Sequence, residues 1–312
     1  MNSRALLTAH GLPAGDLSDL PTSPKRFPDG AWYRVEIPST EGPRCLAAAL
    51  DEAARLDVPT HRFSQGTGVA LLTDDELTEM AALGEREHVE VSLFARPNAA
   101  WGPSASARAP AGGALAAAAW GLDQVVAQLD EIQRAAAFGF RSVLIADIGV
   151  LRLFSEMRDA GELPADMQAK ISVMLPAANA AAARVLEDLG ANTINVPVDL
   201  TLAQLAAIRA AVDIPLDVYV ESPDNLGGIV RLHEIAEIVR VASPVHVKFG
   251  LRNAPDLYPS GSHLESTAVA LSIERVRRAR IGLDLLRRAD GPSTTSERGA
   301  PGLAVPALAV QA

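Results

Sequence analysis

Two charged side chains stand at the carboxyl ends of two predicted strands. The runs LDVYVE (216–221) and VHVKFG (245–250) are typical of β-strands, and they carry Glu221 and Lys248 near their ends. If these strands are neighbours in a parallel sheet, both side chains point into the same hollow. A carboxylate beside an ammonium keeps both charged, whereas burial of a lysine alone favours a base or an imine-forming amine. We therefore expect Glu221 and Lys248 to be catalytic; the alternative is a buried salt bridge.

Acidic side chains at strand ends could also form a metal site. Asp147 ends the run SVLIAD (142–147) and is a further candidate catalytic residue. With Glu36 and Glu221 it would supply oxygen ligands of the kind that Mg²⁺ or Mn²⁺ prefers. Such a metal would stabilise negative charge on a carbonyl oxygen, as enolisation and aldol cleavage require. The alternative is that Asp147 caps the helix that starts at about Gly149.

Other polar side chains near the strand ends are candidates for binding a substrate. Arg96 and Arg252 follow the third and eighth strands, and guanidinium groups suit a carboxylate or a phosphate. Loops after the seventh and eighth strands of a barrel often hold such an anion. The candidate substrate-binding residues are His61, Gln65, Arg96, Asn195, Arg252 and Asn253. For the last loop (250–266) the alternative is ordinary turn formation by Asn, Pro, Gly and Ser without any ligand.

The elements that must position these residues alternate between short β-type runs and amphipathic helical stretches. Eight strands alternating with helices predict a single TIM-type (β/α)8 barrel over residues 31–289. The predicted strands lie at 32–37, within 61–72, and at 89–95, 142–147, 170–175, 193–198, 216–221 and 245–250. Predicted helices include 43–56, 74–86, 121–138, 150–160, 179–189 and 201–212. The alternative is a doubly wound sheet, but its Gly-x-Gly-x-x-Gly motif is absent, so we expect no dinucleotide.

Both ends of the chain differ in composition from the predicted barrel. Residues 1–30 and 290–312 are rich in Pro, Gly and Ser, which predicts a flexible N-terminal extension and a disordered C-terminal tail. The tail ends in the apolar run GLAVPALAVQA after a polar linker, a form that suits a peptide docking into a partner protein. The long connection at 96–117 is typical of a lid over the catalytic face of a barrel.

The composition excludes several classes of protein. With 28 Lys and Arg against 38 Asp and Glu, the net charge of −10 disfavours nucleic-acid binding, so we expect a small-molecule substrate or a protein partner. The single cysteine, Cys45, cannot form an internal disulfide or a four-cysteine iron–sulfur site. No apolar run suits a membrane span or a signal peptide, which predicts a cytoplasmic protein. A monomer and a homo-oligomer both remain open.

The stretch from Arg141 to Asn225 carries blocks that match a known family. SVLIADIGVLRLFSEM, KISVMLPAANAAAARVLEDLGA and NTINVPVDLTLAQLAAI resemble strand–helix blocks of the collagenase-like peptidase family, the unassigned peptidase family thirty-two. The residues that agree with its pattern are Asp147, Gly149, Ser172, Asn179 and Leu200. The chain has Met174, Val198 and Glu221 where the family has Gln, Arg and His. It also lacks the cysteines of the family's iron–sulfur branch. The resemblance thus implies the barrel fold and a branch without the cluster.

Together these features predict an enzyme, a lyase or isomerase that acts on a small anionic carbonyl compound. Glu221 or Asp147 would be the base or metal ligand, and Lys248 would be the electrostatic stabiliser or imine former. Arg96 and Arg252 would hold the anion. One alternative is a metal-dependent hydrolase or peptidase, which the family resemblance implies. The other is a non-catalytic binding or cargo protein that docks through its C-terminal tail.

Overall fold

Eight parallel strands close into a barrel in the computed structural model, which describes residues 5, 8–9, 19–96, 118–289 and 294–308. Each strand pairs with its neighbours in the chain, and β8 pairs with β1 to close the ring. The strands are β1 (Tyr33–Pro38), β2 (Arg62–Ser64), β3 (Glu90–Phe94), β4 (Ser142–Ile145), β5 (Gln168–Ile171), β6 (Thr193–Asn195), β7 (Leu216–Glu221) and β8 (Val245–Phe249). The predicted TIM-type barrel is confirmed.

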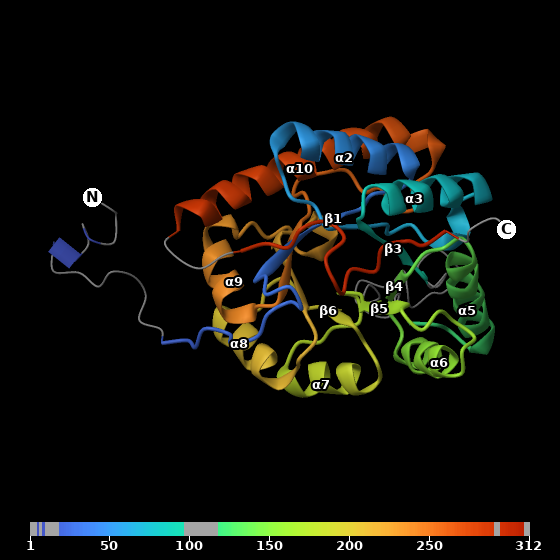
Figure 1. The fold of residues 1–312 in the computed structure, drawn as a ribbon, viewed down its shortest axis with the longest axis horizontal. Helices are drawn as coiled ribbons and strands as arrows, with labels where there is room; N and C mark the ends of the chain where they lie inside the picture. The colour runs from blue at the N-terminus through green and yellow to red at the C-terminus, as the bar shows by residue number, and fades with distance from the viewer. Residues whose placement is uncertain (1–4, 6–7, 10–18, 97–117, 290–293, 309–312) are drawn as a thin grey trace.

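Helices form a ring around the strands (Figure 1). In the described residues they are α2 (Pro43–Leu56), α3 (Asp74–Arg86), α5 (Leu122–Ala137), α6 (Ile148–Asp159), α7 (Ala180–Asp188), α8 (Leu202–Ala211), α9 (Ile235–Ala242) and α10 (Glu265–Arg288). Several begin at a side-chain cap. Thr73 and Thr201 form capping boxes, and Asn179 accepts a hydrogen bond from the backbone of Ala182. These caps explain why predicted and observed helix starts agree closely.

Side chains alternate along the strands between the helix layer and the barrel interior. In β1, Val35 and Ile37 belong to the apolar core, whereas Glu36 is completely buried on the other side of the strand. Its carboxylate lies 2.5 Å from the ammonium of Lys170 on β5, across the barrel. The apolar core is therefore a shell between strands and helices, and the interior of the barrel holds polar and charged side chains.

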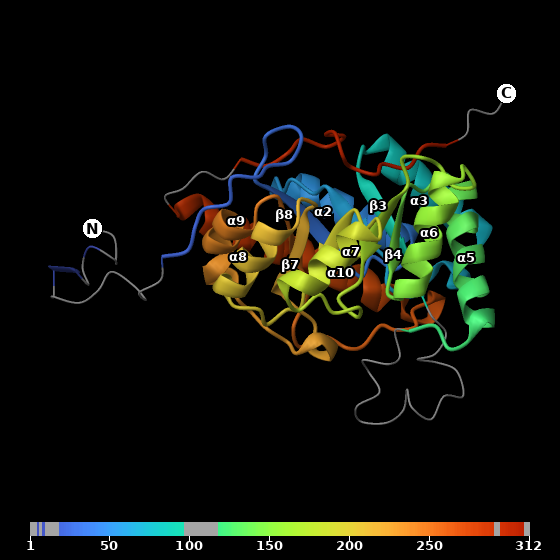
Figure 2. The same cartoon turned by 90° about the horizontal axis from the view of Figure 1, so that it is seen from below.

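Residues 294–308 run across the amino-terminal end of the barrel, where Figure 2 shows them in red. The guanidinium of Arg34, which is 1% exposed, donates to the hydroxyl of Ser296 at 2.8 Å. Farther along, the backbone N–H of Ala307 donates to the carbonyl of Gly139 at 2.9 Å. The prediction of a disordered tail is corrected here, because buried groups of the barrel find their partners in this segment. Residues 290–293 and 309–312 lie outside the described part.

The described end of the N-terminal extension packs against the same face of the barrel. Phe27 is 4% exposed and meets the ring of His246 edge-on, with 5.2 Å between centroids. The backbone N–H of Ser23 donates to the carbonyl of Arg240. Residues 19–30 are therefore bound to the barrel, while most of residues 1–18 and residues 97–117, which hold most of the predicted lid, lie outside the described part. No helix of the described residues has the length and apolar character that crossing a membrane requires.

Candidate active site

A cavity of about 420 Å³ opens at the carboxyl ends of the strands, and we call it the mouth cavity. Its apolar wall includes Phe94, Leu144 and Met174. Its polar lining consists of Ser39, Ser64, Gln65, Arg96, Ser172, Asn195, Tyr219, Asn225, Lys248 and Tyr258. This is the end of the barrel where enzymes of this fold carry their active sites. No described carboxylate lines the cavity, so its charged side chains are those of Lys248 and Arg96.

Lys248 lies between the mouth cavity and the barrel interior, and it is 2% exposed. Its Nζ is 3.1 Å from Oε1 of Glu36 and 4.4 Å from the centre of the Tyr219 ring. When the amide of Asn195 turns its oxygen toward the lysine, that oxygen accepts a hydrogen bond from Nζ at 2.9 Å. The amine of Lys248 is therefore held at the floor of the cavity by an acid, an amide and an aromatic face.

Glu36 links Lys248 to a second lysine that does not line the cavity. Its Oε2 is 2.5 Å from Nζ of Lys170, which is 1% exposed. Burial lowers the pKa of Lys170 to about 8, although Asp217 and Glu36 oppose this shift. Burial alone would raise the pKa of Glu36, but the ammonium groups of Lys170 and Lys248 hold it well below its usual range. One ionised carboxylate thus joins two amines.

Asp217, Arg62 and Glu90 complete what we call the interior ion network, together with Glu36 and Lys170. Oδ2 of Asp217 is 2.6 Å from Nζ of Lys170, and its Oδ1 is 3.0 Å from Nη1 of Arg62. Nε of Arg62 lies 2.7 Å from Glu90. Buried charges are tolerated when each has such partners. The network therefore fixes the position of Glu36 beneath the cavity.

The rim of the mouth cavity carries a tyrosine and an arginine. The hydroxyl groups of Tyr258 and Ser39 are 2.5 Å apart, and burial raises the pKa of Tyr258. The guanidinium of Arg96 lies 5.4 Å from the centre of the Phe94 ring and 5.5 Å from that of Tyr258. Its Nη1 donates to the carbonyl of Gly66 at 2.9 Å. The rim thus combines a protonated phenol with a cation held against aromatic rings.

Four of the residues that the sequence singles out meet at the mouth cavity: Gln65, Arg96, Asn195 and Lys248. The sequence predicts them because polar residues at the carboxyl ends of barrel strands face the active site, which we call the strand-end rule. The structure brings them together. Gln65 also closes its own loop, because its side-chain amide bonds both the N–H and the carbonyl of Gly68. Its contribution to the cavity is therefore a rigid wall.

The predicted pairing of Glu221 with Lys248 is wrong. A register shift between Tyr219 and Glu221 places Phe249 opposite Glu221, while Lys248 lies opposite Tyr219. The carboxylate of Glu221 instead accepts the backbone N–H of Arg252 at 3.0 Å and lies 3.3 Å from Arg278 on α10. Glu221 therefore anchors the loop after β8 and does not line the mouth cavity.

Asp147 is a helix cap, as the alternative interpretation held. Its Oδ1 accepts the N–H groups of Gly149 and Val150 at 2.8 and 3.0 Å, and its Oδ2 accepts the N–H of Ala119. Asp147 does not line the mouth cavity, so it is not positioned to act on a substrate bound there, as the predicted catalytic role would require.

The three predicted metal ligands, Glu36, Asp147 and Glu221, have separate sets of partners. Glu36 lies in the interior ion network, Asp147 caps α6, and Glu221 holds the loop after β8. Within the described ranges, no three His, Cys, Asp or Glu side chains lie close enough to hold a metal ion. The predicted acidic metal set is not assembled.

Three predicted substrate-binding residues lie away from the cavity. His61 precedes β2 rather than ending it, and its ring bonds the backbone of Val35 and Ser296 near the opposite end of the barrel. Arg252 and Asn253 are exposed in the loop after β8, and neither lines the mouth cavity. The error for His61 arises from the position of β2. This strand has only three residues and ends at Ser64, so His61 lies before its amino end and not at its carboxyl end.

Sequence reasoning missed Ser39, Tyr219 and Tyr258. Tyr219 had a signal, because it lies two residues from Asp217 and from Glu221, and alternating residues of a strand share a face. Tyr258 had none, since it lies in the irregular loop that follows β8. Only the closed fold brings that loop over Ser39.

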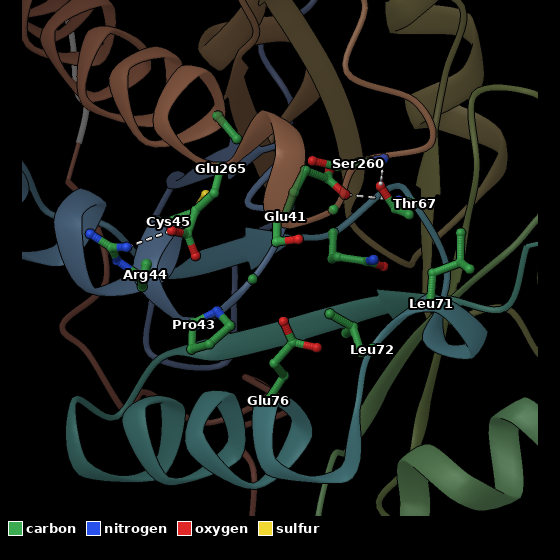
Figure 3. Close-up of a pocket in the computed structure, with 15 residues that line it drawn as sticks. Glu41, Pro43, Arg44, Cys45, Thr67, Leu71, Leu72, Glu76, Ser260 and Glu265 are labelled. Atoms are coloured by element: carbon green, nitrogen blue, oxygen red, sulfur yellow. Dashed lines mark hydrogen bonds and ion pairs between the residues drawn. The ribbon is translucent and has the colours of Figure 1, made fainter.

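A much smaller cavity, of about 30 Å³, lies beside the loops after β1 and β2 (Figure 3). Here Glu41 accepts the N–H groups of Gly66 and Thr67, both at 2.9 Å. The hydroxyl of Thr67 in turn accepts the N–H of Ser260 at 3.0 Å. The cavity has room for about one water molecule. Its residues tie together the loops that carry the rim of the mouth cavity.

A family comparison agrees with the expected resemblance. The model of peptidase family U32 matches residues 119–222, about a third of the chain. This stretch contains β4 to β7 and therefore supplies Ser172, Asn195 and Tyr219 to the mouth cavity. The single cysteine of the sequence is consistent with a branch that lacks the iron–sulfur cysteines. A search of curated proteins found no match.

Several solved structures are similar in fold. The U32 peptidase Mk0906 is 18% identical, with 66% of this chain and 74% of that chain covered and a TM-score of 0.38. The YdjI aldolase from Escherichia coli K12 is 15% identical over 82% of this chain and 90% of that chain, with a TM-score of 0.46. A structure described as native KDPGal is 13% identical, with 81% and 96% covered and a TM-score of 0.43. These likenesses concern the barrel and leave the reaction open.

Proposed function

We propose that the protein is a lyase or isomerase that binds a small anionic carbonyl compound in the mouth cavity and forms an imine with it through Lys248. The observation that carries this proposal is the position of the Lys248 amine. It lies at the floor of a cavity that no described carboxylate lines, and its one acidic contact, Glu36, leads into the barrel. A lysine so placed can act as nucleophile toward a carbonyl carbon above it.

The proton of Lys248 has a route into the barrel. For attack, the ammonium of Lys248 must give up one proton, and Glu36 is in contact to accept it. The same carboxylate contacts Lys170, whose pKa of about 8 leaves it partly unprotonated near neutral pH. Proton transfer from Lys248 through Glu36 to Lys170 therefore leaves a neutral amine at the cavity and a protonated lysine beneath it.

The remaining steps use the other groups of the cavity. The neutral amine adds to the carbonyl carbon, and one of its protons moves to the oxygen to give a carbinolamine. The oxygen takes a second proton and leaves as water, so that an iminium forms on Lys248. The iminium then accepts the electron pair of a neighbouring C–H bond, and the proton of that bond replaces the one that the water carried away. The hydroxyl of Tyr258, which lines the cavity and is bonded to Ser39, would relay this proton: it gives its own proton to the leaving oxygen and takes the proton from the carbon. Arg96 would hold the anionic group of the substrate at the rim.

Reduction of the imine tests this proposal. The purified chain is treated with borohydride in the presence of pyruvate, glyoxylate or glyceraldehyde, and its intact mass is measured. We expect a covalent adduct on the wild type that is absent in Lys248→Met. Arg252→Ala is the matched control, because this exposed cation lies outside the cavity, and its adduct should equal that of the wild type. An adduct that persists in Lys248→Met, or none with any compound, contradicts the imine.

A further inference from the structure

A buried guanidinium, that of Arg275, lies close to Tyr258, in a cavity that both residues line. Arg275, on α10, is 3% exposed, and its Nη1 donates to the backbone carbonyl of Ser39 at 3.2 Å. Its Nε has no hydrogen-bond partner. A guanidinium has five N–H donors and cannot lose its charge, so burial with one neutral acceptor leaves most of its bonding capacity unused.

Among the other buried arginines, Arg209 likewise donates to backbone carbonyls, those of Val212 and Pro244, whereas Arg62 is surrounded by acids. Arg62 contacts three carboxylates, those of Glu36, Glu90 and Asp217. No ion pair within 4.0 Å joins Arg275 to a carboxylate of the described residues. The buried acid Glu41 is directed elsewhere, because its two oxygens accept the backbone N–H groups of Gly66 and Thr67. Arg275 is thus a buried cation without a carboxylate in direct contact among the described residues, and the charge of Glu41 acts on it only over a longer distance.

Arg275 lines a cavity of about 80 Å³, which we call the side cavity. Ser39, Asn225 and Tyr258 line both the side cavity and the mouth cavity, so the two adjoin. A water molecule occupies about 30 Å³ in the liquid, so the side cavity has room for a carboxylate group. Two acids also line the side cavity, and both accept backbone hydrogen bonds: Asp256 from the N–H of Tyr258 and Asp224 from the N–H of Asn253.

We propose that the side cavity is an anion subsite in which Arg275 binds a second anionic group of the substrate. A compound with its carbonyl carbon at Lys248 would place one anionic group near Arg96 and the other beyond Tyr258, at Arg275. The substrate class is therefore a carbonyl compound with two anionic groups, either two carboxylates or a carboxylate and a phosphate. The carbonyl end of this assignment rests on the proposed function, whereas the anion at Arg275 stands on its own contacts.

A matched pair of oxo acids tests the second anionic group. 2-Oxopentanedioate and 2-oxopentanoate have the same carbon chain and differ in the terminal carboxylate. Calorimetric titration of the full chain should give the dicarboxylate a Kd lower by about tenfold to a hundredfold, as a bond to a charged partner contributes. Arg275→Met should lose this preference. Arg277→Met should retain it, because Arg277 is exposed and pairs with Glu274 on the surface of α10.

The NMR signal of the Arg275 Nε–H group reports anion binding at the side cavity independently of any reaction at Lys248. It therefore distinguishes failure of the subsite from failure of the proposed function. Its nitrogen-15 correlation peak is identified as the one missing in Arg275→Lys, a variant that keeps the charge if Arg275→Met does not fold. Acetate and inorganic phosphate, titrated separately into the wild type, should shift this peak, and the stronger of the two identifies the anion. If neither oxo acid binds but the peak shifts, the carbonyl assignment fails and the subsite remains. If neither anion shifts the peak, or the two oxo acids bind equally, the side cavity holds water alone and the inference is overturned.

Discussion

The carboxylate of Glu36 lies 3.1 Å from the amine of Lys248, and its other oxygen is bound to a second lysine inside the barrel. This relationship joins the cavity to the interior ion network. Lys170, the second lysine, has its pKa lowered to about 8 by burial, so its charge changes close to neutral pH. The protonation state of a residue that no substrate touches can thus govern the amine that the substrate meets.

The rate of imine trapping should rise as the pH increases through about 8. Below that pH Lys170 is protonated and cannot accept the proton of Lys248; above it, the neutral Lys170 can accept the proton. The rate of adduct formation with pyruvate and cyanoborohydride, measured from pH 6 to pH 10, checks this. Lys170→Met should move the rise to higher pH while leaving the adduct on Lys248. An unchanged profile in this variant would show that Lys170 takes no part.

Glu36→Gln should destabilise the protein strongly. The substitution leaves Lys170 with one acid partner, Asp217, and leaves Lys248 with none among the described residues. Breaking a buried ion pair by removing one partner costs about 3–5 kcal/mol of unfolding free energy. Urea denaturation measures it. Glu156→Gln, at an exposed position on α6, is the control, because the pair of Glu156 with Arg152 contributes only about 0.3–0.5 kcal/mol. Equal effects of the two substitutions would contradict the burial argument.

The barrel could be predicted from the sequence because its signals are local. Alternating β-type runs and helical stretches such as Pro43–Leu56 and Asp74–Arg86 repeat along the chain, and both helices lie where the pattern predicts. The path of residues 294–308 could not be predicted in this way. Their Pro, Gly and Ser content is typical of a loose tail, and only the closed barrel presents Arg34 and Gly139 as partners.

The site was predictable in part, for a related reason. The strand-end rule places Asn195 and Lys248 at the mouth, since it needs only the carboxyl ends of strands. It fails for Glu221, because the register shift in β7 depends on pairing with β8 and leaves no mark in the sequence. Arg275 lies beyond the rule altogether, since it reaches its cavity from the middle of α10.

The stability of the protein should fall as the pH decreases from about 6.5 to about 4. Burial lowers the pKa of His61 to about 4 and that of His246 to about 3, so the unfolded chain binds more protons than the folded one in this window. Because the unfolded chain binds more protons, the free energy of unfolding increases with pH in this window and decreases on acidification. Urea midpoints at several pH values measure the slope. His61→Gln should flatten it; an equally steep slope would show that His61 does not titrate as its burial requires.

Gly66→Ala should impair catalysis with little effect on folding. A β-carbon at position 66 would lie 2.6 Å from the ring of Tyr258, a contact that cannot be accommodated unless the tyrosine moves. Movement of the ring would separate its hydroxyl from Ser39, to which it is now 2.5 Å away, and shift it relative to the substrate. Misplacement of a reacting group by about 1 Å can lower a rate about a hundredfold. We therefore expect the exchange of substrate protons, followed by NMR in deuterated water, to fall by about tenfold or more, while trapping of the imine on Lys248 continues. If trapping and exchange fell together, Tyr258 would be a part of the wall and not the group that moves the proton.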